Sequence, residues 1–182
     1  MRAKSHLRLG QKLAGHYMSA LPYPCRRAFL LGCTQPDKNP TTYIKGSVRS
    51  QWLRGHNWNN AKRYLCRLIC RLEKKQKFQV IDYYSLGKLI HYTADAFTYV
   101  HNDTISAKIK DHRKYEAALE AFFLTYLENA EVPKHSHIGP CQCILFTCHR
   151  KYMKQPCSVS ADTRFIYHVC NCIMYNLLSK AQ

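Results

Sequence analysis

Histidines and carboxylates recur at helical spacing in one segment of the chain, and together they could hold metal ions. His91 and Asp95 are four residues apart, so on an α-helix they share one face and can contact the same cation. His101 follows six residues after Asp95 and leaves that face, so it must reach a different ion or the helix must bend. Since imidazole nitrogen and carboxylate oxygen are ligands that zinc prefers, this segment is a candidate zinc site.

Further potential ligands lie on both sides of this segment. His112 and Glu116 repeat the spacing of four, Asp37 and His56 bracket a long polar stretch, and His6 opens the chain's first expected helix. Each alone has an ordinary interpretation as a structural histidine, an ion pair or a surface charge. Their occurrence together, on consecutive helices of one short chain, favours a shared metal centre.

These residues resemble the motifs of the bacterial zinc-dependent phospholipases C, from Ser5 to about Phe123. The segments Ser5-His6-Leu7 and Gly32 through Asp37 also look like that family. The most specific part is the string H-x3-D-x5-H followed by H-x3-E, here His91, Asp95, His101, His112 and Glu116.

The resemblance implies two or three zinc ions and a role for each ligand. Asp37, His56, His91 and Asp95 would hold one ion, His101, His112 and Glu116 a second, and His6 with bridging Asp95 a third. In the family an N-terminal tryptophan completes the third site, whereas this chain has Met1 and only five residues before His6. The implied reaction is attack of metal-activated water on phosphorus, which releases diacylglycerol and a phosphorylated headgroup, with Asp37 as the catalytic general base or with zinc-bound hydroxide acting alone.

Two alternatives stay open from the sequence. The S1/P1-type nucleases share the expected fold, but their motif usually carries an extra histidine and Gln-Pro where this chain has residues 96–100, and their later motif does not end in a glutamate such as Glu116. These differences favour the phospholipase branch. A non-catalytic metal-binding relative that kept the ligands is the other alternative.

The elements that must position these residues are predicted to be helices. Apolar positions at i, i+3, i+4 and i+7 predict helices near residues 5–19, 25–32, 59–75, 82–97, 110–126 and 161–179. The segment after Pro140 fits a helix or a strand, and the stretch from Cys33 to His56 shows no helical pattern. We therefore predict one all-α domain over residues 1–182, a multi-helix bundle of the phospholipase C/P1 nuclease type.

The net charge of the chain narrows the class of expected binding partners. With 28 Lys and Arg against 11 Asp and Glu, the formal net charge is +17, which favours an anionic partner such as a phospholipid substrate or an anionic membrane surface. No nucleic-acid-binding motif is apparent, so nucleic acid is the less favoured partner.

The ten cysteines are expected to be mostly reduced and buried, although a disulfide or further metal site near the C-terminus is the alternative. We expect a monomer, without a transmembrane segment, in the cytoplasm or matured from a longer precursor.

Overall fold

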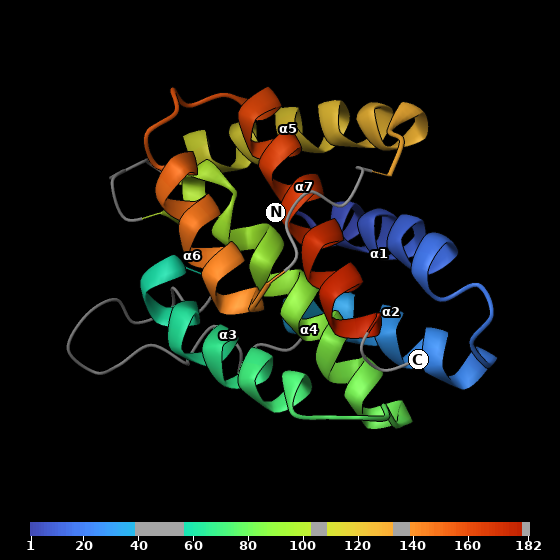
Figure 1. Ribbon diagram of the computed structural model, residues 1–182. Helices are drawn as coiled ribbons and strands as arrows, with labels where there is room; N and C mark the ends of the chain where they lie inside the picture. The colour runs from blue at the N-terminus through green and yellow to red at the C-terminus, as the bar shows by residue number, and fades with distance from the viewer. Residues whose placement is uncertain (39–56, 103–108, 133–138, 180–182) are drawn as a thin grey trace.

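Two buried helices form the centre of the fold in the computed structural model, which describes residues 1–38, 57–102, 109–132 and 139–179. The described elements, in chain order, are α1 (Ala3–Tyr17), α2 (Tyr23–Lys38), α3 (Trp58–Glu73), α4 (Val80–Ala96), the 3-10 segment η2 (Tyr99–His101), α5 (Ile109–Asn129), α6 (Cys141–Tyr152) and α7 (Val159–Leu178). The described residues contain no β-strand, so the predicted all-α class is confirmed. Helices α4 and α7 run side by side through the middle of the molecule, with α3 and α6 on one side and α1 and α2 on the other (Figure 1).

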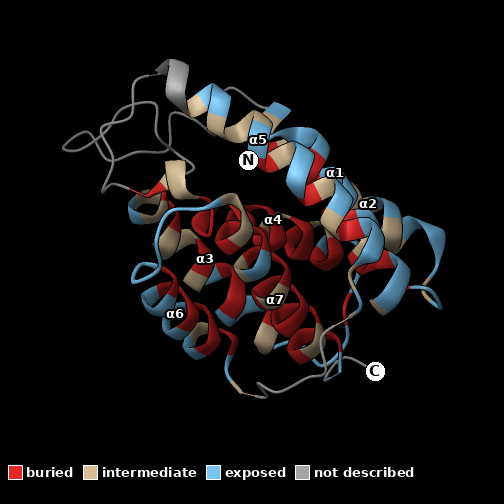
Figure 2. Cartoon of the chain, turned by 90° about the horizontal axis from the view of Figure 1, so that it is seen from above, coloured by how far each residue is buried: buried red, intermediate tan, exposed pale blue. Residues whose placement is uncertain are grey.

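Helices α4 and α7 are buried along almost their whole length, whereas α1, α2, α3 and α6 each present an exposed outer face (Figure 2). Leu86, Leu89 and Ile90 of α4 are almost completely inaccessible to solvent. A helix that is apolar on every side is stable only when other helices surround it. The ligand-bearing helix α4 is therefore fixed on all sides by packing.

Helices α2 and α4 cross in backbone contact at two glycines. A Cβ added to Gly32 would lie 2.1 Å from the carbonyl oxygen of Tyr84, and one added to Gly87 would lie 2.1 Å from that of Phe29. No side chain fits in that space, so only glycine allows the two backbones to approach so closely. This contact sets the register that brings Asp37 of α2 beside His91 of α4.

The prediction that α2 ends at Gly32 was wrong, because this glycine serves close packing and does not cap the helix. The helix continues through Cys33 and Asp37 to Lys38, so Asp37 lies on a helix and not on the expected irregular stretch. The remainder of that stretch, residues 39–56, lies outside the described residues, and with it His56.

The other predicted helices are confirmed with small shifts at their ends. Helix α1 begins at Ala3, two residues before its predicted start. Helix α4 begins after Gln79, and Asp82 accepts a hydrogen bond from the Gln79 backbone N–H at 3.0 Å, as in a capping box. The ambiguous segment after Pro140 is helical.

All ten cysteines are free thiols, and half of them, fewer than expected, are buried, whereas the other five are at least partly exposed. None of the helices in the described residues combines the length and the apolar character that crossing a bilayer requires.

Candidate metal centre

The first group of ligands converges from three helices. His6 of α1 and His91 and Asp95 of α4 are all buried, and their ligand atoms lie within 4.8 Å of one another. The two imidazole rings stack with centroids 3.8 Å apart. Asp37 of α2 joins them, with its Oδ1 3.6 Å from His91 Nε2 and its Oδ2 3.9 Å from His6 Nε2. We call these four residues the inner cluster.

Asp95 directs its two carboxylate oxygens to different partners. Oδ2 lies 3.2 Å from His91 Nε2, and Oδ1 lies 3.2 Å from His6 Nε2. Oδ1 is also 3.8 Å from the Nε2 of His101. A carboxylate with one oxygen on each side can bridge two cations, which is the arrangement that the sequence resemblance implies for Asp95.

A hydrogen bond to a backbone carbonyl fixes the orientation of the His91 ring. Its Nδ1 lies 2.8 Å from the carbonyl oxygen of Cys33, which can only accept, so Nδ1 carries the proton. In the neutral ring Nε2 then has a lone pair, and this lone pair faces Asp37 and Asp95. A lone pair directed at two carboxylates is favourable only if a cation or a proton lies between them.

The second group of ligands comes from η2 and α5. The ligand atoms of His101, His112 and Glu116 also lie within 4.8 Å of one another, and both histidine Nε2 atoms are 3.5 Å from Glu116 Oε1. These three residues, the outer cluster, are less buried: the side chain of His112 is 35% exposed and that of Glu116 is 17% exposed.

The end of α4 explains why His101 joins the outer cluster. The helix stops at Ala96, and Asn102 donates hydrogen bonds from Nδ2 to the carbonyl oxygens of Ala96 and Thr98, both at 3.1 Å. The chain therefore turns through η2 between Asp95 and His101. The expectation that His101 leaves the helix face of Asp95 agrees with this geometry.

The amino group of Met1 lies between the two clusters. It is 2.9 Å from Asp95 Oδ1, 2.7 Å from His101 Nε2 and 3.1 Å from Glu116 Oε1. A buried amine among three potential ligands can act as an ion-pair partner when protonated and as a nitrogen ligand when neutral. From the sequence, the missing N-terminal tryptophan left two alternatives: the backbone near Met1 takes its place, or the third site binds zinc weakly.

Burial and neighbouring charges shift the pKa values of the candidate metal ligands. Burial, followed by the proximity of His91, lowers the pKa of His6 to about 3. Burial and the amino group of Met1 lower the pKa of His101 to about 4. Burial opposes ionisation of Asp95, but the amino group of Met1 and the nearby histidines outweigh it and hold the pKa of Asp95 well below its usual value. Asp95 is therefore ionised at neutral pH while His6 and His101 are neutral, which are the forms that bind metal.

Of the eight predicted ligands, seven lie in the two clusters: His6, Asp37, His91 and Asp95 in the inner cluster, and His101, His112 and Glu116 in the outer cluster. His56 is outside the described residues. Sequence reasoning missed the Cys33 carbonyl and the role of Asn102, since a backbone acceptor carries no residue-type signal and an asparagine after a helix is common.

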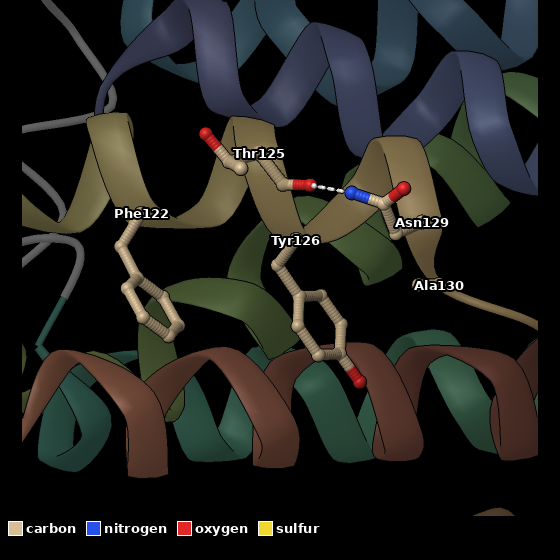
Figure 3. A pocket seen from close by; sticks show the side chains of 5 residues that line it. All are labelled: Phe122, Thr125, Tyr126, Asn129 and Ala130. Carbon is tan, nitrogen blue, oxygen red and sulfur yellow. Dashed lines mark hydrogen bonds between the residues drawn. The ribbon is translucent and has the colours of Figure 1, made fainter.

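A pocket elsewhere on the surface does not involve these residues. It has a volume of about 320 Å³ and lies on the face of α5 that points towards α7, lined by Phe122, Thr125, Tyr126, Asn129 and Ala130 (Figure 3). Its only drawn hydrogen bond, from Asn129 Nδ2 to the Thr125 carbonyl oxygen at 3.3 Å, is internal to the helix. It therefore offers apolar surface but no cluster of reactive groups.

A comparison of the sequence with profiles of known protein families found one match. The sequence profile described as zinc dependent phospholipase C matches residues 6–167. The chain belongs to this family. The match extends the similarity seen in the sequence, which ended near Phe123, through α6 and into the first half of α7. Searches of curated proteins and of solved structures found no match.

The residues present fit the metal that the family description implies. Both clusters offer only imidazole nitrogen and carboxylate oxygen, which are zinc ligands. In zinc-dependent proteins a ligating histidine usually donates its second N–H to a carbonyl or a carboxylate, as His91 does to Cys33. The hydrogen bond from His91 to the Cys33 carbonyl fits this pattern.

Proposed function

We propose that this chain is a zinc-dependent phospholipase C, which hydrolyses the phosphodiester of phospholipids to diacylglycerol and a phosphorylated headgroup. The observation that supports it most is the sharing of Asp95: its oxygens face His91 on one side and His6 on the other, and Oδ1 also approaches His101 of the outer cluster. Two clusters joined by one carboxylate can hold ions close enough together to act on a single phosphate.

The proposed ligands follow the division of the carboxylate oxygens. One ion would be held by His91, Asp95 Oδ2 and Asp37, with His56 as the predicted fourth ligand. A second ion would be held by the outer cluster, and a third by His6 and Asp95 Oδ1. The amine of Met1 lies within reach of this third position.

When bound, zinc ions stabilise negative charge on the phosphoryl oxygens and make water a nucleophile near neutral pH. Asp37 is the proposed general base for that water. Its side chain is 14% exposed whereas that of Asp95 is 1% exposed, so Asp37 is the inner-cluster carboxylate that solvent can reach. A general base must lie within hydrogen-bond reach of the proton that it takes, and a carboxylate at the edge of the cluster can face a water molecule held there.

The substrate class agrees with the charge of the chain. A net charge of +17 attracts anionic lipid surfaces, and each basic side chain near such a surface contributes about 1 kcal/mol of attraction. Peripheral contact with an anionic membrane is therefore part of the proposal.

The function is tested by measuring the release of phosphorylated headgroup from vesicles of phosphatidylcholine, with and without added anionic lipid. We expect release that stops when a chelator removes the metal and returns when zinc is added. Asp37→Asn should lower kcat at least about 100-fold, the smallest usual contribution of a general base. Glu128→Gln, which alters an exposed carboxylate on α5, is the matched control and should retain full activity.

The same protein is assayed on single-stranded DNA. Cleavage of DNA without release of headgroup would replace the phospholipase by a nuclease of the same fold. Zinc binding without activity on either substrate would indicate a non-catalytic relative.

A further inference from the structure

A buried carboxylate outside the two clusters connects the elements that carry the outer cluster. Asp162 lies in the first turn of α7 and is completely buried. Its Oδ2 accepts hydrogen bonds from the backbone N–H of Tyr99 at 2.9 Å and from the hydroxyl of Tyr115 at 2.8 Å. Its Oδ1 accepts one from the hydroxyl of Tyr152 at 2.7 Å.

Hydrogen bonds and the helix N-terminus stabilise this carboxylate, since no Lys or Arg in the described residues forms an ion pair with Asp162. A buried carboxylate without such compensation would be strongly destabilising. Asp162 also sits where the dipole of α7 favours negative charge. The chain has only 11 acidic residues, and Asp162 is fully buried and accepts three hydrogen bonds, which indicates a specific structural role.

Two of the three donors stand next to ligands of the outer cluster. Tyr99 opens η2, and His101 closes it. Tyr115 precedes Glu116 directly and follows His112 by three residues on α5. The third donor, Tyr152, ends α6, which carries no candidate ligand.

The outer cluster needs such support more than the inner cluster does. None of the three residues of η2 is buried, so packing alone does not fix this segment. The inner ligands, by contrast, stand on helices that meet through buried contacts. The side chain of Asp162 accepts hydrogen bonds from both η2 and α5 and so links these two elements to the start of α7.

We propose that Asp162 is a positioning residue for the outer metal cluster: it holds Tyr99 and Tyr115 so that His101, His112 and Glu116 meet at one ion. This inference rests on the proposed metal centre. It assigns Asp162 no contact with substrate or metal. Its effect passes through the backbone of η2 and the side chain of Tyr115.

The test compares zinc affinity in three variants, by competition with a chromophoric chelator and by zinc content after dialysis. Asp162→Asn replaces one accepting oxygen with an NH₂ group that cannot accept from Tyr115 or Tyr152. We expect the affinity of one zinc ion to fall about 10–100-fold, as is usual for loss of an outer-shell partner, while the inner ions stay bound.

Two single-hydroxyl variants separate positioning from a general loss of stability, and they keep the test valid if Asp162→Asn fails to fold. Tyr115→Phe and Tyr152→Phe each remove one hydrogen bond from the same carboxylate. Only Tyr115→Phe should weaken zinc binding, although both should lower the melting temperature.

Wild-type zinc affinity in both Asp162→Asn and Tyr115→Phe would overturn the inference and leave the proposed function intact. Equal weakening in Tyr115→Phe and Tyr152→Phe would also overturn it, because it would show a merely structural role. A wild-type protein that binds no zinc would instead overturn the metal centre itself.

Discussion

The inner and outer clusters use the same kinds of ligand but hold them differently. The inner ligands stand on α1, α2 and α4, and the side chains of His6, His91 and Asp95 are each at most 1% exposed. The outer ligands stand on η2 and α5, and the side chain of His112 is 35% exposed. One cluster is part of the hydrophobic core, and the other lies at its edge.

In the proposed metal centre, burial and hydrogen bonding would therefore contribute in different proportions to the preorganisation of the two clusters. In the inner cluster, the backbone contact between Gly32 and Gly87 fixes the relative position of the helices, and the Cys33 carbonyl orients His91. In the outer cluster, a short segment without buried residues is held through Asp162. A protein can thus couple one ion to its folding and leave another more exchangeable.

The largest expected effect comes from altering Asp95, the carboxylate shared between the clusters, and the next from altering Glu116, the single carboxylate of the outer cluster. Asp95→Asn removes charge that both His91 and His6 face, so it should eliminate at least two ions and lower kcat/KM about 1000-fold, which corresponds to about 4 kcal/mol. Glu116→Gln should lose only the outer ion and cost about 100-fold. Metal content and headgroup release, measured on the same preparations, check both values.

Retention of all ions in Asp95→Asn would contradict the bridging role of this carboxylate. Equal ion loss in the two variants would contradict the division into two clusters. The exposed-acid variant Glu128→Gln serves again as the control.

The contrast between the clusters also explains which contacts could be predicted from the sequence. Pairs on one helix, His91 with Asp95 and His112 with Glu116, follow from spacing alone, because helix geometry fixes which residues share a face. Contacts between helices do not follow from spacing. Gly32 carries the same sequence signal whether it ends a helix or allows a close crossing, and only the packing against Gly87 distinguishes the two.

Asp162 was missed for a related reason. Its three donors lie 10 to 63 residues away along the chain, and one of them is a backbone N–H. A lone aspartate in the first turn of a helix is ordinarily explained by the helix dipole, so nothing in the sequence indicated a wider role. Residue spacing and the family resemblance supplied the candidate ligands, and helical periodicity supplied the all-α fold, but none of these supplied the contacts that orient the ligands.

A substitution at the helix crossing should disturb the inner cluster selectively. Gly32→Ala places a methyl group 2.1 Å from the Tyr84 carbonyl oxygen, so α2 and α4 must separate. We expect a loss of about 1–3 kcal/mol in the free energy of unfolding, as for other overpacked sites, and weaker binding of the inner ions. Urea denaturation and chelator competition measure the two effects.

The matched control is Gly15→Ala in α1, where nothing lies within 4 Å of the added Cβ. It should leave metal binding unchanged and increase stability by up to about 1 kcal/mol, because alanine is the better helix former. If Gly32→Ala were as stable as wild type, the backbone contact would not be what holds the inner cluster together.

The pH dependence of the metal-free protein compares one histidine from each cluster. The pKa is about 3 for His6 and about 4 for His101 in the folded state, against about 6.5 in an unfolded chain. Below pH 6.5 the unfolded state binds protons that these folded side chains do not, so stability falls as the pH decreases. Each histidine contributes a slope of up to about 1.4 kcal/mol per pH unit, for His101 down to about pH 4 and for His6 down to about pH 3. His91, whose pKa is raised because Asp95 outweighs the effect of burial, contributes with the opposite sign, so the variants are compared with wild type and not with a calculated total.

His6→Gln and His101→Gln should each flatten the decline in unfolding free energy between pH 6.5 and 4.5, measured by urea denaturation of chelator-treated protein. An unchanged slope in His6→Gln would mean that the inner histidine titrates normally and that the inner cluster is open to water, which would remove the distinction between the two clusters.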